Sequence, residues 1–126
     1  MRFLLDTAVL VFATGAPERL SKRAASTLKD PENILEVSTV SLAEIAIKVS
    51  IGKLDLPSAT VRGTLQDLSI RALPYSTEHA FGLLTLPWHH KDPFDRLIIA
   101  VALVEDVAVI TSDDKFKSYK GLRIIW

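Results

Sequence analysis

The chain of 126 residues contains no cysteine, carries no net charge and has only five glycines, and each shortage excludes a class of protein. Without cysteine there is no structural disulfide, no thiolate-bound zinc or iron–sulfur cluster, and no cysteine nucleophile. The glycines are too scattered for a dinucleotide-binding G-x-G-x-x-G, and Gly52-Lys53 lacks the rest of a phosphate-binding loop. Fifteen basic and fifteen acidic side chains cancel, so any binding to nucleic acid would need a local patch rather than the overall charge.

Long apolar runs are also absent, because none reaches the ~18 residues of a membrane span. The opening from Met1 to Ala16 resembles a secretion signal, but Asp6 interrupts its apolar stretch, and we therefore expect a cytoplasmic protein. No G-x-S-x-G motif is present, which excludes the usual serine hydrolase on an α/β sheet. His89-His90 has no spaced partners that would indicate a metal site, so we expect a polar loop there, and we expect His79 on a helix surface.

Strand-like and helix-like segments alternate along the chain. The strand-like segments are short and aliphatic or β-branched: Phe3–Leu5, Leu35–Ser38, Ile70–Leu73, Val107–Ile110 and Leu122–Ile125. Apolar residues at helical spacing lie between them, in Pro17–Lys29, Ser41–Ile51, Ser58–Ser69, Thr77–Leu86 and Asp95–Glu105. This alternation predicts one α/β domain over residues 1–126, with a mostly parallel sheet covered by helices on both faces.

The groups that remain for chemistry are carboxylates that follow strands or begin helices. Asp6 follows the first strand and Asp113 the fourth, Glu44 lies early in the helix after the second strand, and Asp92 and Asp95 open the apolar helix before the fourth strand. Helix capping is a sufficient explanation for any one of them alone. The segment from 41 to 44 matches a capping box, and the segment from 92 to 95 matches an N-cap, a proline at N1 and an acid at N3.

The acids taken together indicate more than capping. Residues just past the carboxyl ends of parallel strands gather at one edge of the sheet, so Asp6 and Asp113 would face each other if the first and fourth strands are neighbours. Glu44 and Asp95, at helix starts, can point into the same space. Converging carboxylates repel one another unless a cation neutralises them, and oxygen ligands alone suit Mg²⁺ or Mn²⁺. Such a site is suited to activating water against a phosphodiester.

Four segments resemble, in the same order, the motifs of PIN-domain ribonucleases, and most closely those of the VapC-type toxins of bacterial toxin–antitoxin pairs. They are Leu4-Leu5-Asp6-Thr7, Ser41-Leu42-Ala43-Glu44-Ile45, Asp92-Pro93-Phe94-Asp95-Arg96-Leu97-Ile98-Ile99-Ala100 and Thr111-Ser112-Asp113. The resemblance covers essentially the whole chain. It implies a five-stranded parallel sheet in the order 3-2-1-4-5, Mg²⁺- or Mn²⁺-dependent cleavage of RNA, homodimerisation, and inhibition by a small antitoxin protein.

The resemblance also implies roles for individual residues. The acidic quartet of the family, which supplies catalytic residues and metal ligands, is matched by Asp6, Glu44, Asp95 and Asp113. Thr111 matches a hydroxyl residue that supports the site through hydrogen bonds, while Asp92 and Asp114 are additional acids without an assigned role. Arg96 and Lys48 lie beside quartet members and could contact phosphate, although Lys48 is equally well placed to pair with Glu44 along the helix.

Two other functions stay open at this stage. A phosphatase that forms an aspartyl-phosphate on Asp6 would usually carry a second acid two residues later, where this chain has Ala8. A binding module without catalysis would have no need of four converging acids. The expected homodimer has a second basis, because so short a chain has difficulty hiding all of its helical apolar residues in one core, among them Leu42, Ile45, Val49, Leu83, Leu84 and Leu86.

Overall fold

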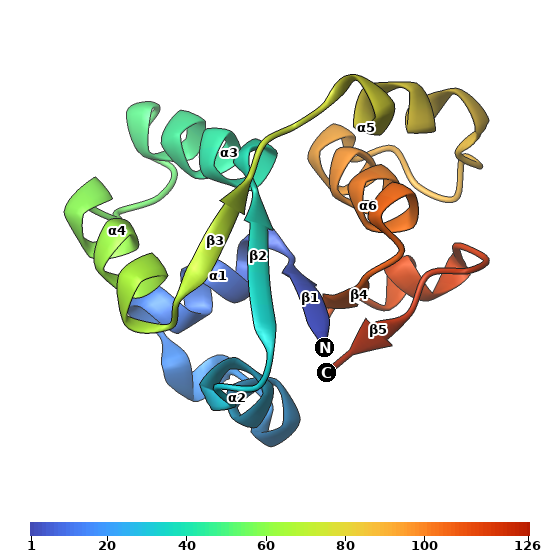
Figure 1. The fold of residues 1–126 in the computed structure, drawn as a ribbon. Coiled ribbons are helices and arrows are strands. Elements are labelled where there is room, and N and C mark those ends of the chain that lie inside the picture. Colours follow the sequence, from blue (N-terminus) through green and yellow to red (C-terminus); the bar gives the residue numbers. More distant parts are fainter.

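Five parallel strands form one sheet with helices on both faces in the computed structural model, which describes residues 1–126 (Figure 1). The strands pair in the order β3-β2-β1-β4-β5, with bounds β1 (Arg2–Leu5), β2 (Ile34–Ser38), β3 (Ile70–Leu73), β4 (Ala108–Ile110) and β5 (Ile124–Ile125). Both the α/β class and the strand order expected from the sequence are therefore confirmed. The first and fourth strands are neighbours, as the gathering of the acids requires.

The register of β1 aligns the strand ends at the edge where the acids were predicted. Leu5 lies opposite Val37 of β2 on one side and opposite Ile110 of β4 on the other. The backbone N–H of Asp6 then donates to the carbonyl oxygen of Ile110 at 3.0 Å, so the pairing continues one residue past the strand. Asp6 consequently stands directly beside the end of β4.

Six α-helices connect or follow the strands, and short 3₁₀ turns accompany them. The helices are α1 (Thr7–Gly15), α2 (Lys22–Lys29), α3 (Thr39–Ser50), α4 (Ser58–Asp67), α5 (Thr77–Phe81) and α6 (Pro93–Glu105), and the 3₁₀ turns are Pro17–Arg19, Gly82–Thr85 and Asp114–Ser118. None of these helices has the length and apolar character that crossing a membrane requires.

Several helix boundaries differ from the predicted ones for identifiable reasons. Helix α1 was not predicted, because its sequence is apolar on every side and shows no stripe at helical spacing. The predicted helix Pro17–Lys29 is divided, since the Ser21 side chain caps a new helix by accepting the N–H of Ala24 at 3.0 Å. Similarly, only the first part of the predicted helix Thr77–Leu86 is an α-helix, which ends at Phe81. A 3₁₀ turn follows it.

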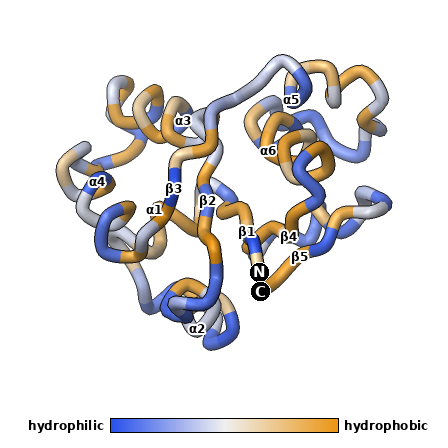
Figure 2. The backbone as a smooth tube through the Cα atoms, in the orientation of Figure 1, coloured by the Kyte–Doolittle hydropathy of each residue, from blue (hydrophilic) through white to orange (hydrophobic).

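Two hydrophobic cores lie on the two faces of the sheet, and alternating residues of β1 feed them. Phe3 and Leu5 pack with residues of α1, α2, α3 and α4, whereas Leu4 packs with α6 and the 3₁₀ turn before β5. The central part of α6 is buried on most sides, as its sequence predicted, and the hydropathy colouring shows it as a largely apolar coil (Figure 2). Helices α3 and α6 contact each other, and residues near the start of each lie at the end of the sheet where β1 and β4 finish.

His79 is buried, and the expectation of a surface position was wrong. Its Nδ1 accepts the backbone N–H of Ser76 at 3.0 Å while the Ser76 hydroxyl accepts the N–H of His79, which completes a capping box at the start of α5. Its Nε2 lies 3.0 Å from Glu105 Oε2 at the end of α6, and Arg2 donates to the other oxygen of Glu105. The imidazole therefore fastens α5 to α6, which hydrophobic spacing alone could not reveal.

Candidate active site

An acidic pocket of about 570 Å³ opens where β1 and β4 end and α3 and α6 begin. All four acids predicted as the quartet border it, namely Asp6, Glu44, Asp95 and Asp113, and Asp92 joins them. Asp114 is not among the lining residues; its side chain is 88% exposed and pairs with Lys117. The structure thus brings together the acids of four separate sequence segments and separates Asp114 from them.

Thr111 connects two of these acids. Its hydroxyl donates to Oδ2 of the buried Asp6 at 2.8 Å and accepts the backbone N–H of Asp113 at 3.0 Å. Asp6 occupies the N-cap position of α1, but its side chain makes no capping hydrogen bond. Capping therefore does not explain the Asp6 carboxylate. Asp113, in contrast, does accept the backbone N–H of Lys115 at 2.9 Å, so it also supports the turn that follows.

Glu44 is buried in the body of α3 and caps nothing. Helix α3 begins at Thr39 behind the N-cap Ser38, two residues earlier than predicted, so the expected capping box between Ser41 and Glu44 is wrong. The Ser41 hydroxyl instead accepts a hydrogen bond from Thr7 at 2.9 Å. Glu44 Oε2 accepts from Lys48 Nζ at 2.7 Å, whereas Glu44 Oε1 is buried without a partner. A buried carboxylate oxygen without a partner is costly unless a ligand satisfies it.

The start of α6 agrees with its sequence pattern. Asp92 is the N-cap and accepts the backbone N–H of Asp95 at 3.0 Å, and Pro93 occupies the first helical position. Asp95 lies about one helical turn after this cap. It lines the pocket, and its side chain is largely covered. His90, which was not among the predicted site residues, lies close to Asp95, with 3.4 Å between His90 Nε2 and Asp95 Oδ2.

Burial and mutual repulsion change the acidity of two members of the pocket. Burial raises the pKa of Asp6 to about 6; the hydrogen bond from Thr111 opposes this rise, and the charges of Glu44 and Asp113 add to it. Burial also raises the pKa of Asp95 to about 7, and neighbouring acids, Asp6 foremost, add to this increase. Both carboxylates are therefore held in surroundings that disfavour their charge, which a nearby cation would relieve.

The donor set fits a hard divalent cation, although the side chains are not closed around one. No three acidic or histidine groups are gathered tightly enough to hold an ion as they stand. The pocket nevertheless offers carboxylate oxygens from four segments, and Glu44 Oε1 is buried and unsatisfied. Oxygen ligands of this kind suit Mg²⁺ or Mn²⁺ rather than a softer metal.

The two basic residues singled out by the sequence have different positions. Arg96 is 4% exposed; its guanidinium donates to the carbonyl oxygens of Pro87 at 2.7 Å and Leu86 at 3.2 Å and stacks on Trp88. The expectation that Arg96 could contact phosphate is therefore wrong, because backbone carbonyls of a loop hold it behind the pocket. Lys48 forms the expected pair with Glu44 and also lines the pocket, with 47% of its side chain exposed.

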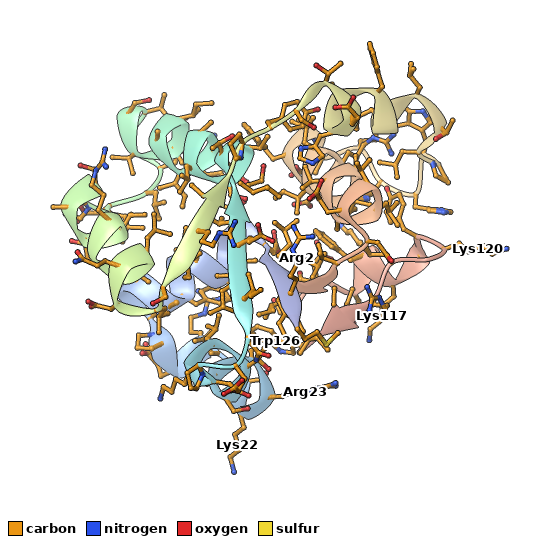
Figure 3. The ribbon with its side chains drawn as sticks, in the orientation of Figure 1. Arg2, Lys22, Arg23, Lys117, Lys120 and Trp126 are labelled. Carbon is orange, nitrogen blue, oxygen red and sulfur yellow. The ribbon has the colours of Figure 1, made fainter.

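Of the other basic residues, one that was not predicted from the sequence also lines the pocket, and others lie far from it. Lys53, which sequence reasoning missed because it lies in a turn without a motif, lines the pocket together with Lys48. Lys22 and Arg23 project away from the protein at α2, and they do not line the pocket (Figure 3). Lys48 and Lys53 are therefore the two basic residues that line the acidic pocket.

Comparisons with known proteins agree with this fold. The family model of the PIN domain matches residues 3–122. Ribonuclease VapC22 of Mycobacterium tuberculosis is 28% identical over 123 residues, which cover 95% of this chain and 93% of that protein. VapBC2 from Rickettsia felis, solved with a DNA fragment from its promoter, superposes with a TM-score of 0.77 at 20% identity, covering 99% of this chain and 98% of that chain.

A second solved structure, DNA-bound VapBC from Salmonella typhimurium, gives a TM-score of 0.70 at 19% identity, and the match covers 99% of this chain and 97% of that chain. At these identities the solved structures establish the shared fold. The family model spans the chain from β1 to the turn before β5, including the strand ends and helix starts that carry the four acids. The chain belongs to the PIN domain family.

Proposed function

We propose that this protein is a metal-dependent endoribonuclease that acts as the toxin of a toxin–antitoxin pair. The observation that carries the proposal is the pocket at the ends of β1 and β4, bordered by Asp6, Glu44, Asp95 and Asp113 in a chain of the PIN family. The relative VapC22 is a ribonuclease, and two of the solved neighbours are a member of the VapBC family of toxin–antitoxin systems and a toxin–antitoxin complex. RNA is accordingly the proposed substrate, and the cytoplasm is the proposed place of action.

The acids would hold Mg²⁺ or Mn²⁺, with Asp6, Asp95 and Asp113 as ligands and Glu44 as a fourth ligand or the group that orients a coordinated water. When bound, the ion supplies an acidified water and stabilises the charge that develops on the phosphodiester. The protein's own contribution is to fix the ligands. Thr111 holds the Asp6 carboxylate relative to the backbone of Asp113 through two hydrogen bonds, so the segments that carry these two acids are fixed to each other.

Phosphate recognition is assigned to the lysines at the pocket. Lys48 and Lys53 line it, and the Lys48 ammonium is half-exposed while it pairs with Glu44. Both side chains can attract a phosphate group toward the acids, and such attraction weakens as salt screens it. We expect higher salt to weaken substrate binding more strongly in the wild type than in Lys53→Gln, since the variant has lost one of these contacts.

An antitoxin protein is the proposed partner, and an apolar groove beside the pocket is its proposed docking site. The groove lies between α3 and α4, has a volume of about 400 Å³, and is lined mainly by hydrophobic side chains. Ile45 borders both the groove and the acidic pocket, so a partner segment seated in the groove would end next to the acids. An apolar helical face of the antitoxin is the complementary occupant.

The decisive experiment measures cleavage of a fluorescently labelled single-stranded RNA by purified protein. We expect cleavage with Mg²⁺ or Mn²⁺, none in EDTA, and a loss of several orders of magnitude in Asp6→Asn. Asp114→Asn is the matched control, because Asp114 is an exposed acid outside the pocket, and it should cleave like the wild type. Full activity in EDTA, or equal losses in the two variants, would contradict the proposal. Turnover of a small phosphate monoester would favour the phosphatase instead.

A further inference from the structure

A histidine with an unsatisfied nitrogen lies behind the acidic pocket. The His90 side chain is 7% exposed, and its Nε2 is buried without a hydrogen-bond partner, 3.4 Å from Asp95 Oδ2. That separation is slightly longer than an N–H···O hydrogen bond, and rotation of the Asp95 carboxylate about its own side-chain bond can shorten it. No other acidic group lies within ion-pair distance of this imidazole.

The neighbours of His90 favour the tautomer that carries its proton on Nε2. Arg96 has only donors, so its Nη1 donates to the Tyr119 hydroxyl oxygen, 3.4 Å away. The Tyr119 hydroxyl proton is then free to be donated to His90 Nδ1, which lies at 2.8 Å. A neutral imidazole that accepts at Nδ1 carries its proton on Nε2. In this tautomer the Nε2–H points toward Asp95 as a donor.

The same helical turn that carries Asp95 also fixes this donor in space. Arg96, the next residue of α6, binds the carbonyl oxygens of Leu86 and Pro87 at the start of the loop that leads to His90. Tyr119 is buried in the core beneath that loop. Arg96 thus holds the start of the loop and contacts Tyr119, the hydrogen-bond partner of His90. These contacts connect His90 to the turn of α6 that carries Asp95.

We propose that His90 is a positioning residue of the metal site: it donates from Nε2 to Asp95 Oδ2 and leaves the other oxygen of Asp95 to the pocket. A neutral donor suits this place, because it satisfies a carboxylate oxygen without the full positive charge that would compete with a metal cation. The inference rests on the proposed metal-dependent function and adds to it a residue outside the acidic quartet.

The test compares three variants by Mn²⁺ affinity, measured from the electron paramagnetic resonance signal of free Mn²⁺, and by melting temperature. His90→Leu removes the donor and should weaken Mn²⁺ binding by about 10- to 100-fold. His90→Gln keeps an N–H donor at a similar reach and should remain within about threefold of the wild type. His89→Leu is the control, since His89 lies in the same loop and packs against the Tyr119 ring but has no contact with Asp95.

A purely structural role would lower the melting temperature of His90→Leu and leave the Mn²⁺ affinity unchanged, and this result would overturn the inference. Equal affinities in His90→Gln and His90→Leu would do the same. Should His90→Leu not fold, nitrogen-15 spectra of the wild type decide, because a proton on Nδ1 excludes the donor direction. Wild-type protein that neither binds Mn²⁺ nor cleaves RNA would defeat the proposed function itself, whereas binding and cleavage that persist in His90→Leu defeat only this inference.

Discussion

Asp6 and Thr111 are separated by 105 positions in the chain, yet the Thr111 hydroxyl donates to Asp6 Oδ2 at 2.8 Å in the buried interior. The same hydroxyl accepts the N–H of Asp113. One side chain therefore links the acid after β1 to the acid after β4, and the arrangement of the pocket depends on it.

Replacing Thr111 by valine should damage the pocket without changing its shape. Valine has the same outline but cannot donate to Asp6 or accept from Asp113, so unfolding should become easier by about 1–3 kcal/mol, the cost of leaving buried polar groups unpaired. RNA cleavage should fall with it. Thr111→Ser keeps the hydroxyl and should retain most activity. Denaturant unfolding and cleavage assays measure both effects, and a fully active valine variant would show that this link is dispensable.

Neutralising Asp6 should stabilise the metal-free protein. At pH 8 the Asp6 carboxylate is ionised beside other acids, so Asp6→Asn removes repulsion and should raise the melting temperature by a few degrees, roughly 1 kcal/mol. The stabilisation that Mg²⁺ or Mn²⁺ gives the wild type should shrink in the variant, because binding to the folded state produces it. Melting curves of both proteins, with EDTA and with excess metal, test this. An unchanged metal-free midpoint together with an undiminished metal shift would remove Asp6 from the site.

The stability of the metal-free protein should depend on pH through Asp95. Burial raises its pKa to about 7 in the folded protein, above the value of roughly 4 expected for an unfolded chain. The folded state therefore binds more protons between these values, so the contribution of Asp95 to stability is present at low pH and is lost as the pH rises through 7. Asp95→Asn should show a smaller decline between pH 5 and pH 8 in EDTA. Parallel curves for the two proteins would contradict the raised pKa.

Asp92 and Asp95 should differ in their importance for cleavage although both line the pocket. Asp92→Asn keeps the cap of α6, since asparagine caps about as well as aspartate, and should retain most activity. Asp95→Asn should lose activity by orders of magnitude. Steady-state cleavage rates for the two variants provide the comparison, and equally large losses would mean that Asp92 also belongs to the metal ligands.

A homodimer should depend on the exposed apolar residues that follow α5. Of the residues proposed from the sequence as too many for one core, Ile45 and Leu86 are buried, but Leu84 is 81% exposed, and Phe81 and Trp88 nearby are exposed as well. We expect the wild type to be a dimer at micromolar concentration. In Leu84→Glu the dissociation constant of the dimer should be at least about tenfold larger. Light scattering measures the mass, and a monomeric wild type would refute the prediction.

Sequence patterns located the acids better than the residues that orient them. Asp6 and Asp113 could be placed because any residue past the end of a parallel strand reaches the same edge of the sheet. The orientation of the Arg96 side chain could not be predicted. Its guanidinium binds carbonyl oxygens of a loop, and no sequence periodicity predicts the path of that loop. His90 was hidden for the same reason: its partners, Tyr119 and Asp95, lie on other segments.

Sequence patterns also failed to predict where two of the helices begin. The capping box expected from Ser41 to Glu44 had a competitor three residues earlier, Ser38 at the end of β2. The earlier cap prevailed because α3 follows β2 without a loop. Helix α1 gave no periodic signal, since both of its sides are apolar. Tertiary packing decides such cases, and a local pattern does not contain that information.

The distance in sequence between Asp6 and Thr111 has a consequence for synthesis of the protein. β1 leaves the ribosome well before its neighbour β4, because Thr111 lies 105 positions after Asp6 in the chain. Until β4 and the residues from Thr111 to Asp113 emerge, Asp6 has neither its hydrogen-bond donor nor the opposing acid. A nascent chain that has not yet produced β4, or one that is cut short before it, therefore contains only half of the acidic pocket.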